Sequence, residues 1–220
     1  MAKPQKYSLE NSPSLKNWGQ PADLPRHNAS LDCGWGRLVF GHTFKENEEL
    51  ISLLREETDG QRNLALYIRN PQVLVAEAPQ DLFIDPSFTF RLSLPAYTPP
   101  EDKQAPFIIR PLSADQDSAC ANRIYKSRNM VGAEQDFLKA HEDSSHIQYW
   151  VAADKKTNNV MAVCMSVDHK QAFDDPENGS SLWALAVDPQ AKYPGIGIAM
   201  VEHIIKFFKQ QGRAFTDVSV

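Results

Sequence analysis

The sequence is poor in cysteine: among 220 residues only Cys33, Cys120 and Cys164 occur, scattered and without paired spacing. This scarcity disfavours a disulfide-stapled scaffold and favours a reducing compartment. Long apolar runs are missing too, since none approaches the ~18 residues needed to span a membrane. The first residues also lack the apolar core of a signal peptide. We therefore expect a cytoplasmic protein with no membrane partner.

Long basic runs are absent as well. The chain carries 23 Lys and Arg against 28 Asp and Glu, a formal net charge of −5. Nucleic-acid binding requires clustered cations that neutralise phosphates, so we expect no nucleic-acid partner. A local basic pocket for one small anion is still compatible with this composition. The six histidines show no zinc-ligand spacing, and we expect no metal.

What is present predicts two α/β modules. Residues 1–30 hold several prolines among Asn, Ser and Gln, which predicts an irregular arm. Residues 31–94 predict a small α/β module, and residues 95–106, with four prolines, predict an exposed linker at a domain boundary. In the small module the patterns predict strands at 36–44, 63–69, 72–78 and 88–94, and a helix over 45–60 that ends at Gly60.

The pattern of residues 107–220 is clearer. Ser113 and Gln116 match the S-x-x-Q capping box, which predicts a helix from there to about Arg128. The other predicted elements are a strand at 107–112, a helix at 134–142, a hairpin over 147–169, a strand at 182–188, a helix after a glycine turn and a strand at 214–220. In the helix after the glycine turn, Val201, Ile204, Ile205 and Phe208 share an apolar face, and Glu202, His203, Lys206 and Lys209 face away from it.

The glycine turn lies in 185-LAVDPQAKYPGIGIAMVEHIIKFF-208. Gly195 and Gly197 stand where a helix begins, although glycine is a poor helix former. The first amides of a helix lack intrahelical partners, and glycine removes the Cβ atoms that would hold a phosphate away from them. The alternative is a plain tight turn. The preceding apolar strand, which ends in Asp-Pro, and Lys192 three residues before Gly195 favour a pyrophosphate cradle.

This segment resembles the GNAT family of N-acetyltransferases, whose hallmark is [Q/R]-x-x-G-x-[G/A] after a strand often reading L-x-V-x-P. The chain supplies 185-LAVDP-189 and then 192-KYPGIG-197. For residues 107–220 the resemblance implies an α/β (α+β) fold, with a GNAT-like mixed central sheet flanked by helices, preceded here by the smaller α/β module. It also implies acetyl-CoA as co-substrate.

The resemblance also implies which residues bind the coenzyme. Backbone amides of Gly195, Ile196, Gly197, Ile198 and Ala199 would meet the pyrophosphate. The strand that holds the pantetheine arm splays open in this family, and it is matched here by Leu185, Ala186 and Val187. Three residues depart from the hallmark: Lys192 replaces Arg or Gln, Tyr193 stands where a further glycine is common, and Pro194 has no N–H to donate.

A larger departure follows the last predicted strand. In this family the strand matching 214–220 is followed by a helix bearing an Asn and a Tyr and by two more strands. The tyrosine that usually protonates the departing CoA thiolate has no counterpart in the chain. An apolar strand with an unpaired edge is unfavourable in a free-standing domain, so we expect a downstream ligase domain or a homo-oligomer to complete the fold.

A second resemblance involves the small module. The segments 31-LDCGWGRLVFGHTF-44 and 64-LALYIRNPQV-73, taken with the acetyltransferase half, are similar to the amino-terminal part of N-acetylglutaminylglutamine synthetases. These bacterial enzymes join an acetyltransferase region to an ATP-grasp ligase. The resemblance implies a small-molecule amine acceptor, the α-amine of glutamine or of a glutamine dipeptide.

Direct transfer in a ternary complex needs a base for the ammonium and a proton donor for the thiolate. The candidate bases are Asp168 and His169, at the end of the strand 160–168, and Glu134, near the helix that covers the acceptor. Ser219 is a candidate donor. Each of these residues could instead be an ordinary solvated or strand residue. The same holds for the loop acids Asp174, Asp175 and Glu177.

Two other functions stay open. One is a catalytically silent acyl-CoA-binding module that regulates or scaffolds a larger ligase, which the missing tyrosine segment favours. The other is a thiol hydrolase built on Cys33, in 32-DCGWG-36, with His42. For this motif the alternative is a tight glycine turn.

Overall fold

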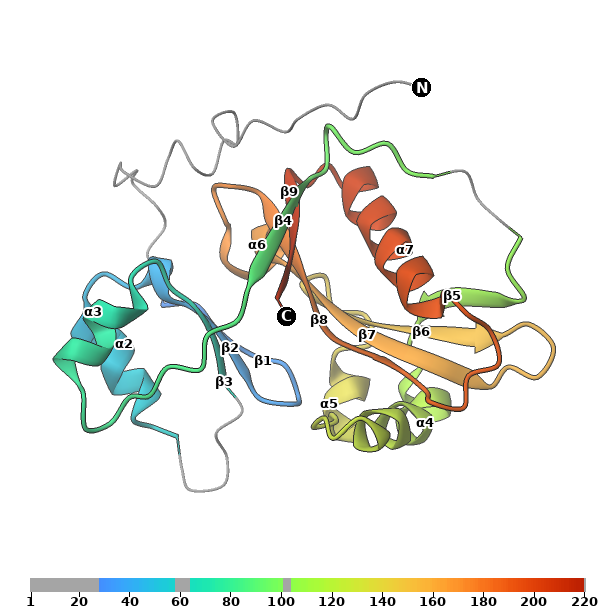
Figure 1. The fold of residues 1–220 in the computed structure, drawn as a ribbon, viewed down its shortest axis with the longest axis horizontal. Helices are drawn as coiled ribbons and strands as arrows, with labels where there is room; N and C mark the ends of the chain where they lie inside the picture. The colour runs from blue at the N-terminus through green and yellow to red at the C-terminus, as the bar shows by residue number, and fades with distance from the viewer. Residues whose placement is uncertain (1–27, 58–63, 101–103, 220) are drawn as a thin grey trace.

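The computed structural model describes residues 28–57, 64–100 and 104–219, which form two sheets with helices packed on them (Figure 1). The smaller sheet has the order β1-β2-β3, antiparallel and then parallel. Its elements are β1 (Ser30–Asp32), β2 (Arg37–Phe40), the 3-10 helix η2 (Gly41–Thr43), α2 (Asn47–Leu54), β3 (Leu64–Tyr67) and α3 (Pro71–Glu77). Most of the arm predicted for 1–30 lies outside the described residues.

Two predictions in this region are wrong. The segment 72–78 is not a strand: it lies almost entirely within α3, which begins at Pro71, where the fixed φ of proline suits a first helical residue. The buried Leu74 and Ala78 are four residues apart, the helical spacing, whereas alternate burial would have marked a strand. The helix predicted over 45–60 ends at Leu54, and its predicted stop, Gly60, lies outside the described residues.

The larger sheet is mixed and has the order β4-β9-β8-β7-β6-β5. Only the β8–β9 pair is parallel. The strands of this larger sheet are β4 (Thr89–Ser93), β5 (Phe107–Pro111), β6 (Ile147–Asp154), β7 (Val160–Asp168), β8 (Gly179–Val187) and β9 (Phe215–Ser219). The predicted class, a mixed sheet flanked by helices and preceded by a smaller α/β unit, is confirmed.

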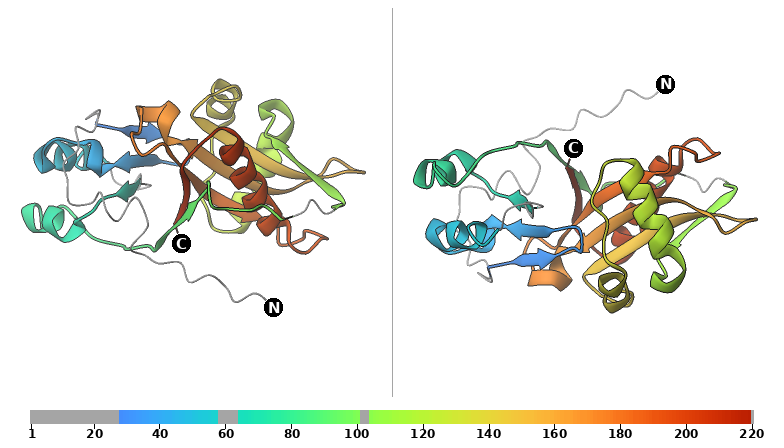
Figure 2. Two further views of the ribbon diagram at one scale, coloured as in Figure 1. Left: turned by 90° about the horizontal axis from the view of Figure 1, so that it is seen from above. Right: turned by 90° about the horizontal axis from the view of Figure 1, so that it is seen from below.

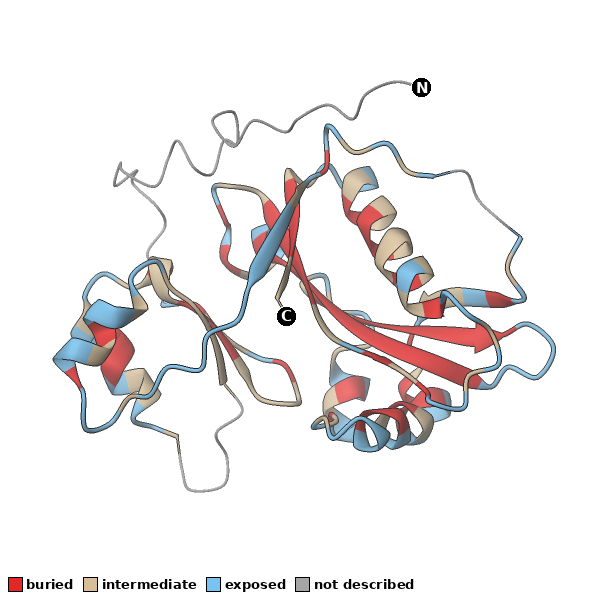
Figure 3. Cartoon of the chain, in the orientation of Figure 1, coloured by how far each residue is buried: buried red, intermediate tan, exposed pale blue. Residues whose placement is uncertain are grey.

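Helices cover both faces of this sheet. The helix α7 (Ile196–Gln210) lies on one face, and α4 (Ala114–Ser127) and α5 (Gln135–Ala140) lie on the other (Figures 1 and 2). The strands β6 and β7 are buried along almost their whole length because both of their faces are covered (Figure 3). On the α7 face, Met200, Ile204 and Phe208 fill the core, so Met200 takes the place predicted for the half-buried Val201. None of the described helices is long and apolar enough to span a membrane.

The start of α4 was predicted correctly, but not the interaction that caps it. The Ser113 side chain makes no capping hydrogen bond. Instead, the buried Asp117 carboxylate accepts the Ser113 N–H at 2.8 Å and binds the Arg110 guanidinium at 2.6 and 3.0 Å. A carboxylate at a helix N-terminus is favoured by the helix dipole, so Asp117 takes over the role predicted for Gln116.

The edge of β9 is covered by the same chain, which corrects the expected unpaired edge. Strand β4 pairs with β9 from Thr89 opposite Ser219 to Ser93 opposite Phe215. Lys209 fixes the segment after β4, because its ammonium donates to the carbonyls of Leu94 at 2.8 Å and Tyr97 at 2.6 Å. Lys209 is therefore not the solvated side chain that the helical pattern predicted.

The two predicted modules also share a hydrophobic core. Cys33, Leu38 and Phe40 of the small sheet belong to the same buried cluster as Tyr149 and Met165 of the large sheet. The Tyr149 hydroxyl donates to the Cys33 carbonyl at 2.6 Å. The boundary predicted at 95–106 therefore separates segments that share both a sheet and a core.

One ion pair holds β4 on β9, and we expect it to be important for stability. The Arg91 guanidinium donates to both oxygens of Asp217 at 2.8 Å and stacks on the Phe215 ring, 3.5 Å from its centroid. The Asp217 side chain is only 3% exposed. Arg91→Ala leaves this carboxylate buried and unpaired, so it should lower the free energy of unfolding by about 3–5 kcal/mol in urea titrations.

Arg55 provides the matched control. It binds Asp81 in an ion pair whose side chains are 54% and 42% exposed. Such exposed pairs contribute less than about 1 kcal/mol, so Arg55→Ala should have a small effect. Equal losses for the two variants would contradict the role assigned to Arg91.

Candidate functional site

The second half of β8 departs from regular pairing. Val163 of β7 faces Ala186, but Met165 faces Trp183, so Cys164 stands opposite two residues of β8. Ala184, at this bulge, has a φ of 50°, which is unusual for a residue other than glycine. The ladder between β8 and β9 covers only Gly179–Leu182. The described part of β9 ends at Ser219, one residue past Val218, the partner of Leu182, so the splayed strand that the resemblance implies for the pantetheine arm stays a prediction.

The helix α7 begins beside the second half of β8. Gly195 precedes its first residue with a φ of 79°, so the turn itself requires a glycine there. Gly197 has no such requirement. A Cβ built on it would lie 3.4 Å from Val187 Cγ2 and 4.0 Å from Leu185 Cδ2, which is ordinary contact. A plain tight turn thus explains Gly195 but not Gly197, where the first turn of α7 presents only backbone to Val187 and Leu185 of β8.

The amides at this helix end are available to a ligand. The first intrahelical bond runs from the Ala199 N–H to the Gly195 carbonyl at 3.0 Å, so the amides of Ile196, Gly197 and Ile198 precede it. The first turn holds no acidic residue, and Gly195 supplies no side-chain cap. The Ile198 side chain is 69% exposed, so the turn is open to solvent. The geometry suits an anion.

The departures from the hallmark have structural explanations. The Tyr193 hydroxyl donates to Asp154 at 2.8 Å and so ties the glycine loop to the β6–β7 turn. Hydrogen bonds from the Thr157 amide, the Tyr193 hydroxyl and the Lys156 amide lower the pKa of Asp154 to about 2. Lys192 is exposed on the same loop, as a cation that attracts an anion should be.

Sequence reasoning missed two arginines at the end of β8. Arg123 of α4 donates to the Asp188 carboxylate at 2.6 Å, and Arg128, just after α4, donates to the Val187 carbonyl at 2.8 Å. They are 65 and 59 residues from these partners, so no local pattern could have brought them to the glycine turn. Asp188 balances the charge of Arg123, so Arg128 at the end of β8 and Lys192 on the following loop supply the positive charge there.

Two of the candidate bases are buried and engaged. The Asp168 carboxylate binds Arg213 Nε at 2.8 and 2.9 Å and accepts the Gln171 amide at the start of α6 (His169–Phe173). The His169 ring lies 2.9 Å from Ser181 Oγ and 3.7 Å from the Asp175 carboxylate. Neither side chain is the solvated loop group that was the alternative. A base that is exposed to the substrate had been predicted, but both side chains are buried.

The other two candidates lie elsewhere. Glu134 is exposed and immediately precedes α5, with no side-chain capping bond. Ser219, at the end of β9, lies 3.0 Å from the Thr89 hydroxyl. The structure therefore places Asp168 next to His169, but it shows no contact joining these two residues to Glu134 or Ser219.

The loop acids are mostly engaged as well. Asp175 is buried and accepts the Gly179 amide at 2.8 Å, and Glu177 binds Arg91 at 3.0 Å. Only Asp174 is exposed, and it pairs with Lys170. The loop whose acids could have been ordinary solvated residues is therefore largely a folded turn between α6 and β8.

The thiol-hydrolase hypothesis is not supported. Cys33 is fully buried, and burial, with the nearby Asp32 charge, raises the pKa of its thiol to about 12, so the reactive thiolate is disfavoured. Its amide donates to the Gly36 carbonyl at 2.8 Å, and Gly34 has a φ of 74°. The motif forms the tight glycine turn that was the alternative.

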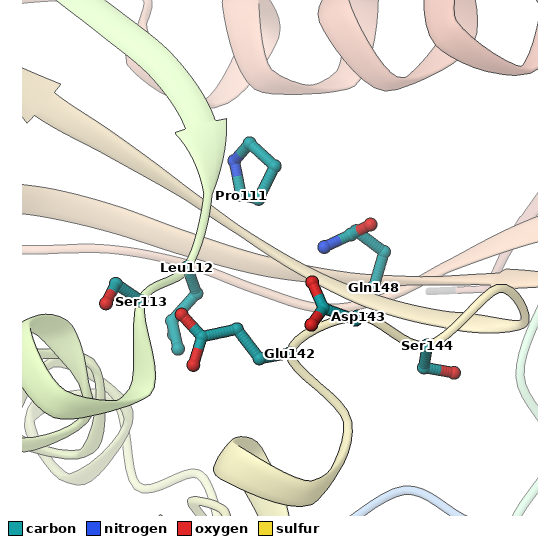
Figure 4. Close-up of a pocket in the computed structure, with 7 residues that line it drawn as sticks. All are labelled: Pro111, Leu112, Ser113, Glu142, Asp143, Ser144 and Gln148. Atoms are coloured by element: carbon teal, nitrogen blue, oxygen red, sulfur yellow. The ribbon is translucent and has the colours of Figure 1, made fainter.

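A cavity of about 440 Å³ lies at the other end of the large sheet. Figure 4 shows Glu142 and Asp143 on the segment after α5, Gln148 on β6, and residues from the end of β5. No basic side chain lines it, and its two carboxylates would repel a diphosphate, so it does not fit the coenzyme. Among the residues with defined positions, no group of three or more His, Cys, Asp or Glu side chains is placed to hold a metal ion.

No protein-family model matches the chain, and no curated protein matches it. Solved structures show a partial likeness. N-acetylglutamate synthase from Neisseria gonorrhoeae, complexed with coenzyme A and N-acetyl-glutamate, is 20% identical with a TM-score of 0.39, over 50% of this chain and 24% of that one. An aminoglycoside acetyltransferase from an uncultured soil metagenomic sample, complexed with sisomicin, is 16% identical with a TM-score of 0.43, over 52% and 78%.

A GNAT family acetyltransferase from Brucella melitensis, complexed with acetyl-CoA, is 15% identical with a TM-score of 0.36, over 49% of this chain and 71% of that one. The chain thus spans about a quarter of the synthase. These scores are too low to establish a shared fold, and function has to be inferred from the chain's own geometry.

The Asp188 ion pair at the glycine loop predicts a pH dependence. Burial alone would raise the pKa of Asp188, but hydrogen bonds from the Arg123 guanidinium and the Gln190 amide outweigh it and lower the pKa. A lowered folded-state pKa adds stability above the unfolded value, ~3.9, which is lost as the pH falls through the folded-state pKa. Wild type should therefore be more stable than Asp188→Asn near neutral pH, and the difference should shrink in acid.

Urea unfolding of both proteins across the acidic range checks this expectation. Asp115→Asn is the control, because Asp115 forms an ion pair with Lys139 in which both side chains are more than half exposed. A stability difference for Asp188→Asn that does not change with pH would show that the carboxylate charge is not what stabilises the loop.

Proposed function

We propose that the chain is an acetyl-CoA-dependent N-acetyltransferase that acts on the amine of a small molecule. The observation that supports this most directly is the start of α7, where the amides of Ile196, Gly197 and Ile198 precede the first intrahelical bond. The first turn holds no acidic residue, and Gly197 presents backbone without a side chain beside Leu185 and Val187. A diphosphate is the kind of anion that such helix-start amides bind.

The coenzyme residues follow from this geometry and from the GNAT resemblance. The turn from Gly195 to Ala199 would bind the pyrophosphate through the amides of Gly195, Ile196, Gly197 and Ile198, because the Ala199 N–H already donates to the Gly195 carbonyl. Leu185, Ala186 and Val187, beyond the bulge of β8, would hold the pantetheine arm through their backbone. Lys192 and Arg128 would add positive charge, with Arg123 holding the loop in place through Asp188.

The transfer is proposed to be direct, from acetyl-CoA to the amine in a ternary complex. Orienting the two reactants can supply much of the acceleration, and a positioned base would add ~10²–10⁴-fold. Asp168, His169, Glu134 and Ser219 stay the proposed catalytic residues. Of these, the exposed Glu134 can reach solvent, whereas Arg213 neutralises Asp168.

The proposed acceptor is glutamine or a glutamine dipeptide, on the similarity of residues 31–44 and 64–73 to N-acetylglutaminylglutamine synthetases. The same similarity supports a downstream ligase domain as a partner. A homo-oligomer is the other proposed partner, and a cytoplasmic location is proposed from the sequence.

A silent acyl-CoA-binding module is the second candidate. It is favoured by the structural engagement of Asp168 and His169, which leaves no evident base at the coenzyme site. An assay of thiol release from acetyl-CoA over a panel of amino acids and dipeptides separates the two functions. Binding of coenzyme A without thiol release would support the silent module.

Two glycines test the coenzyme site with matched stability effects. Gly195 and Gly212 flank α7, both with φ above 70°, and a Cβ built on either has no neighbour within 4 Å. Alanine at either position should therefore cost a similar ~1–2 kcal/mol of backbone strain. Only Gly195→Ala shifts the amides before the first helical bond, so calorimetry should show coenzyme A binding at least about 10-fold more weakly, a loss of ~1.4 kcal/mol.

Gly212→Ala should bind coenzyme A within about twofold of wild type, since ~0.4 kcal/mol is the most that a distant helix end should transmit. Backbone amide resonances of residues 196–199 should move when coenzyme A is added to the wild-type protein. Unmoved resonances at millimolar coenzyme A, or equal weakening by both alanine variants, would overturn the proposed site.

A further inference from the structure

Three buried polar atoms lack a hydrogen-bond partner among the described residues: Trp35 Nε1, the Tyr67 hydroxyl and the Tyr125 hydroxyl. Most buried polar groups in proteins are hydrogen-bonded, and each exception calls for an explanation. The three atoms come from three separate segments: the β1–β2 turn, β3 and α4. Figure 1 shows the small sheet and α4 approaching the same region of the large sheet.

Two of the three side chains meet at Trp183, the residue before the bulge of β8, and the third, Tyr125, lies in the same hydrophobic cluster. The Trp35 ring stacks on Trp183 with centroids 6.1 Å apart, and the Tyr67 ring meets it edge-on at 5.6 Å. Tyr125 packs in the same cluster, where Cys164 is close enough to contribute to its raised pKa. Cys164 Sγ in turn lies 3.5 Å from the Trp183 carbonyl.

Comparable aromatic side chains nearby are satisfied. The Tyr149 hydroxyl bonds the Cys33 carbonyl, Trp150 Nε1 bonds Ser166, and Trp183 Nε1 bonds Ser181. The fold can therefore provide partners for buried aromatic donors in this region. The Ser181 and Ser219 hydroxyls lie close enough to Tyr67 to oppose the effect of burial on its pKa, but neither is in hydrogen-bonding geometry with it.

The cluster and the proposed coenzyme site lie on opposite faces of β8. Trp183 and Ala184 pack against the α4 face of the sheet, whereas Val187 packs against the α7 face, where the coenzyme site lies. A substrate among the three aromatic side chains and a coenzyme at α7 would thus meet at the bulge of β8. The bulge at Ala184 is the only irregularity in the β7–β8 pairing of the described residues.

The chemistry of the three groups selects one kind of ligand atom. An indole N–H can only donate, and burial raises the pKa of both Tyr67 and Tyr125, so their hydroxyls stay protonated and can donate. Three donors match the lone pairs of a carbonyl, carboxamide or carboxylate oxygen. A bare alkylamine offers no such atom.

We propose that Trp35, Tyr67 and Tyr125 form the acceptor site of the acetyltransferase and bind a carbonyl or carboxylate oxygen of an amine substrate of the amino-acid class. The inference rests on the proposed function. It gives the small sheet a role: the sheet and its β1–β2 turn carry two of the three donors to β8. The substrate's amine then lies on the side of β8 from which it can reach the thioester.

Removal of single hydroxyls tests the site. Tyr67→Phe and Tyr125→Phe should each raise the KM for an amino-acid acceptor about 3- to 10-fold, the range of one neutral hydrogen bond. The KM for acetyl-CoA should stay within about twofold, because the coenzyme site is on the other face. Neither variant should lower the unfolding midpoint, since each removes a buried atom that lacks a partner.

Tyr149→Phe is the matched control, because its hydroxyl already bonds Cys33. It should lower the unfolding midpoint and leave the acceptor KM unchanged. A substrate comparison adds a second test: wild type should acetylate L-glutamine, L-glutamate or an amino-acid amide in preference to n-butylamine. Unchanged acceptor KM in both tyrosine variants, or equal turnover of n-butylamine, overturns the inference while leaving the acetyltransferase function intact.

A binding measurement keeps the site testable apart from turnover. The indole resonance of Trp35, followed by NMR in the protein saturated with coenzyme A, should shift when L-glutamine or L-glutamate is added and not with n-butylamine. If no panel amino acid moves it, the donors do not hold the acceptor and the inference fails. Absence of coenzyme A binding would instead refute the proposed function, and with it the basis of this site.

Discussion

The irregular pairing between β7 and β8 is the constraint on which the candidate site depends. Because Cys164 faces two residues of β8, the strand is bulged at Ala184, shortly after its last pair with β9 at Leu182. Beyond the bulge, Leu185 and Val187 lie beside Gly197 of α7. Before it, Trp183 stacks on Trp35 of the β1–β2 turn. The bulge therefore lies between the two halves of the proposed site.

The N-terminal half of the chain supports the large sheet in two ways. Strand β4 pairs with β9 and is held by the Arg91–Asp217 ion pair, so β9 has a partner on each side. The small sheet packs its Phe40 against His169 and Phe173. Residues 31–94 therefore extend the large sheet and cover part of it, and they also keep a small core of their own around Leu50, Ile51 and Leu74.

Local patterns predicted most elements, because burial on one face leaves a periodic trace in sequence. The hairpin over 147–169, the helix after Gly195 and the strand at 214–220 all had such traces. What failed depended on contacts distant in sequence. The placement of β4 in the large sheet, the anchoring of Lys209 and the arrival of Arg123 at Asp188 follow from packing and leave no local signal. At 72–78 the apolar residues form a short continuous run, whose periodicity does not separate strand from helix, and the burial of Leu74 and Ala78 decided it.

The same distinction explains why the sequence contains a signal for the proposed coenzyme site and none for the proposed acceptor site. A diphosphate is bound by backbone amides, and the need for bare backbone appears in sequence as glycine, at Gly195 and Gly197. An acceptor oxygen is bound by side-chain donors, which any tryptophan or tyrosine in the sequence could supply. Only the structure separates Trp35 and Tyr67 from Tyr149 and Trp150, because it shows which donors already have a partner. A buried donor without a partner costs stability, and a protein keeps such donors at little net cost where a ligand supplies the missing bond.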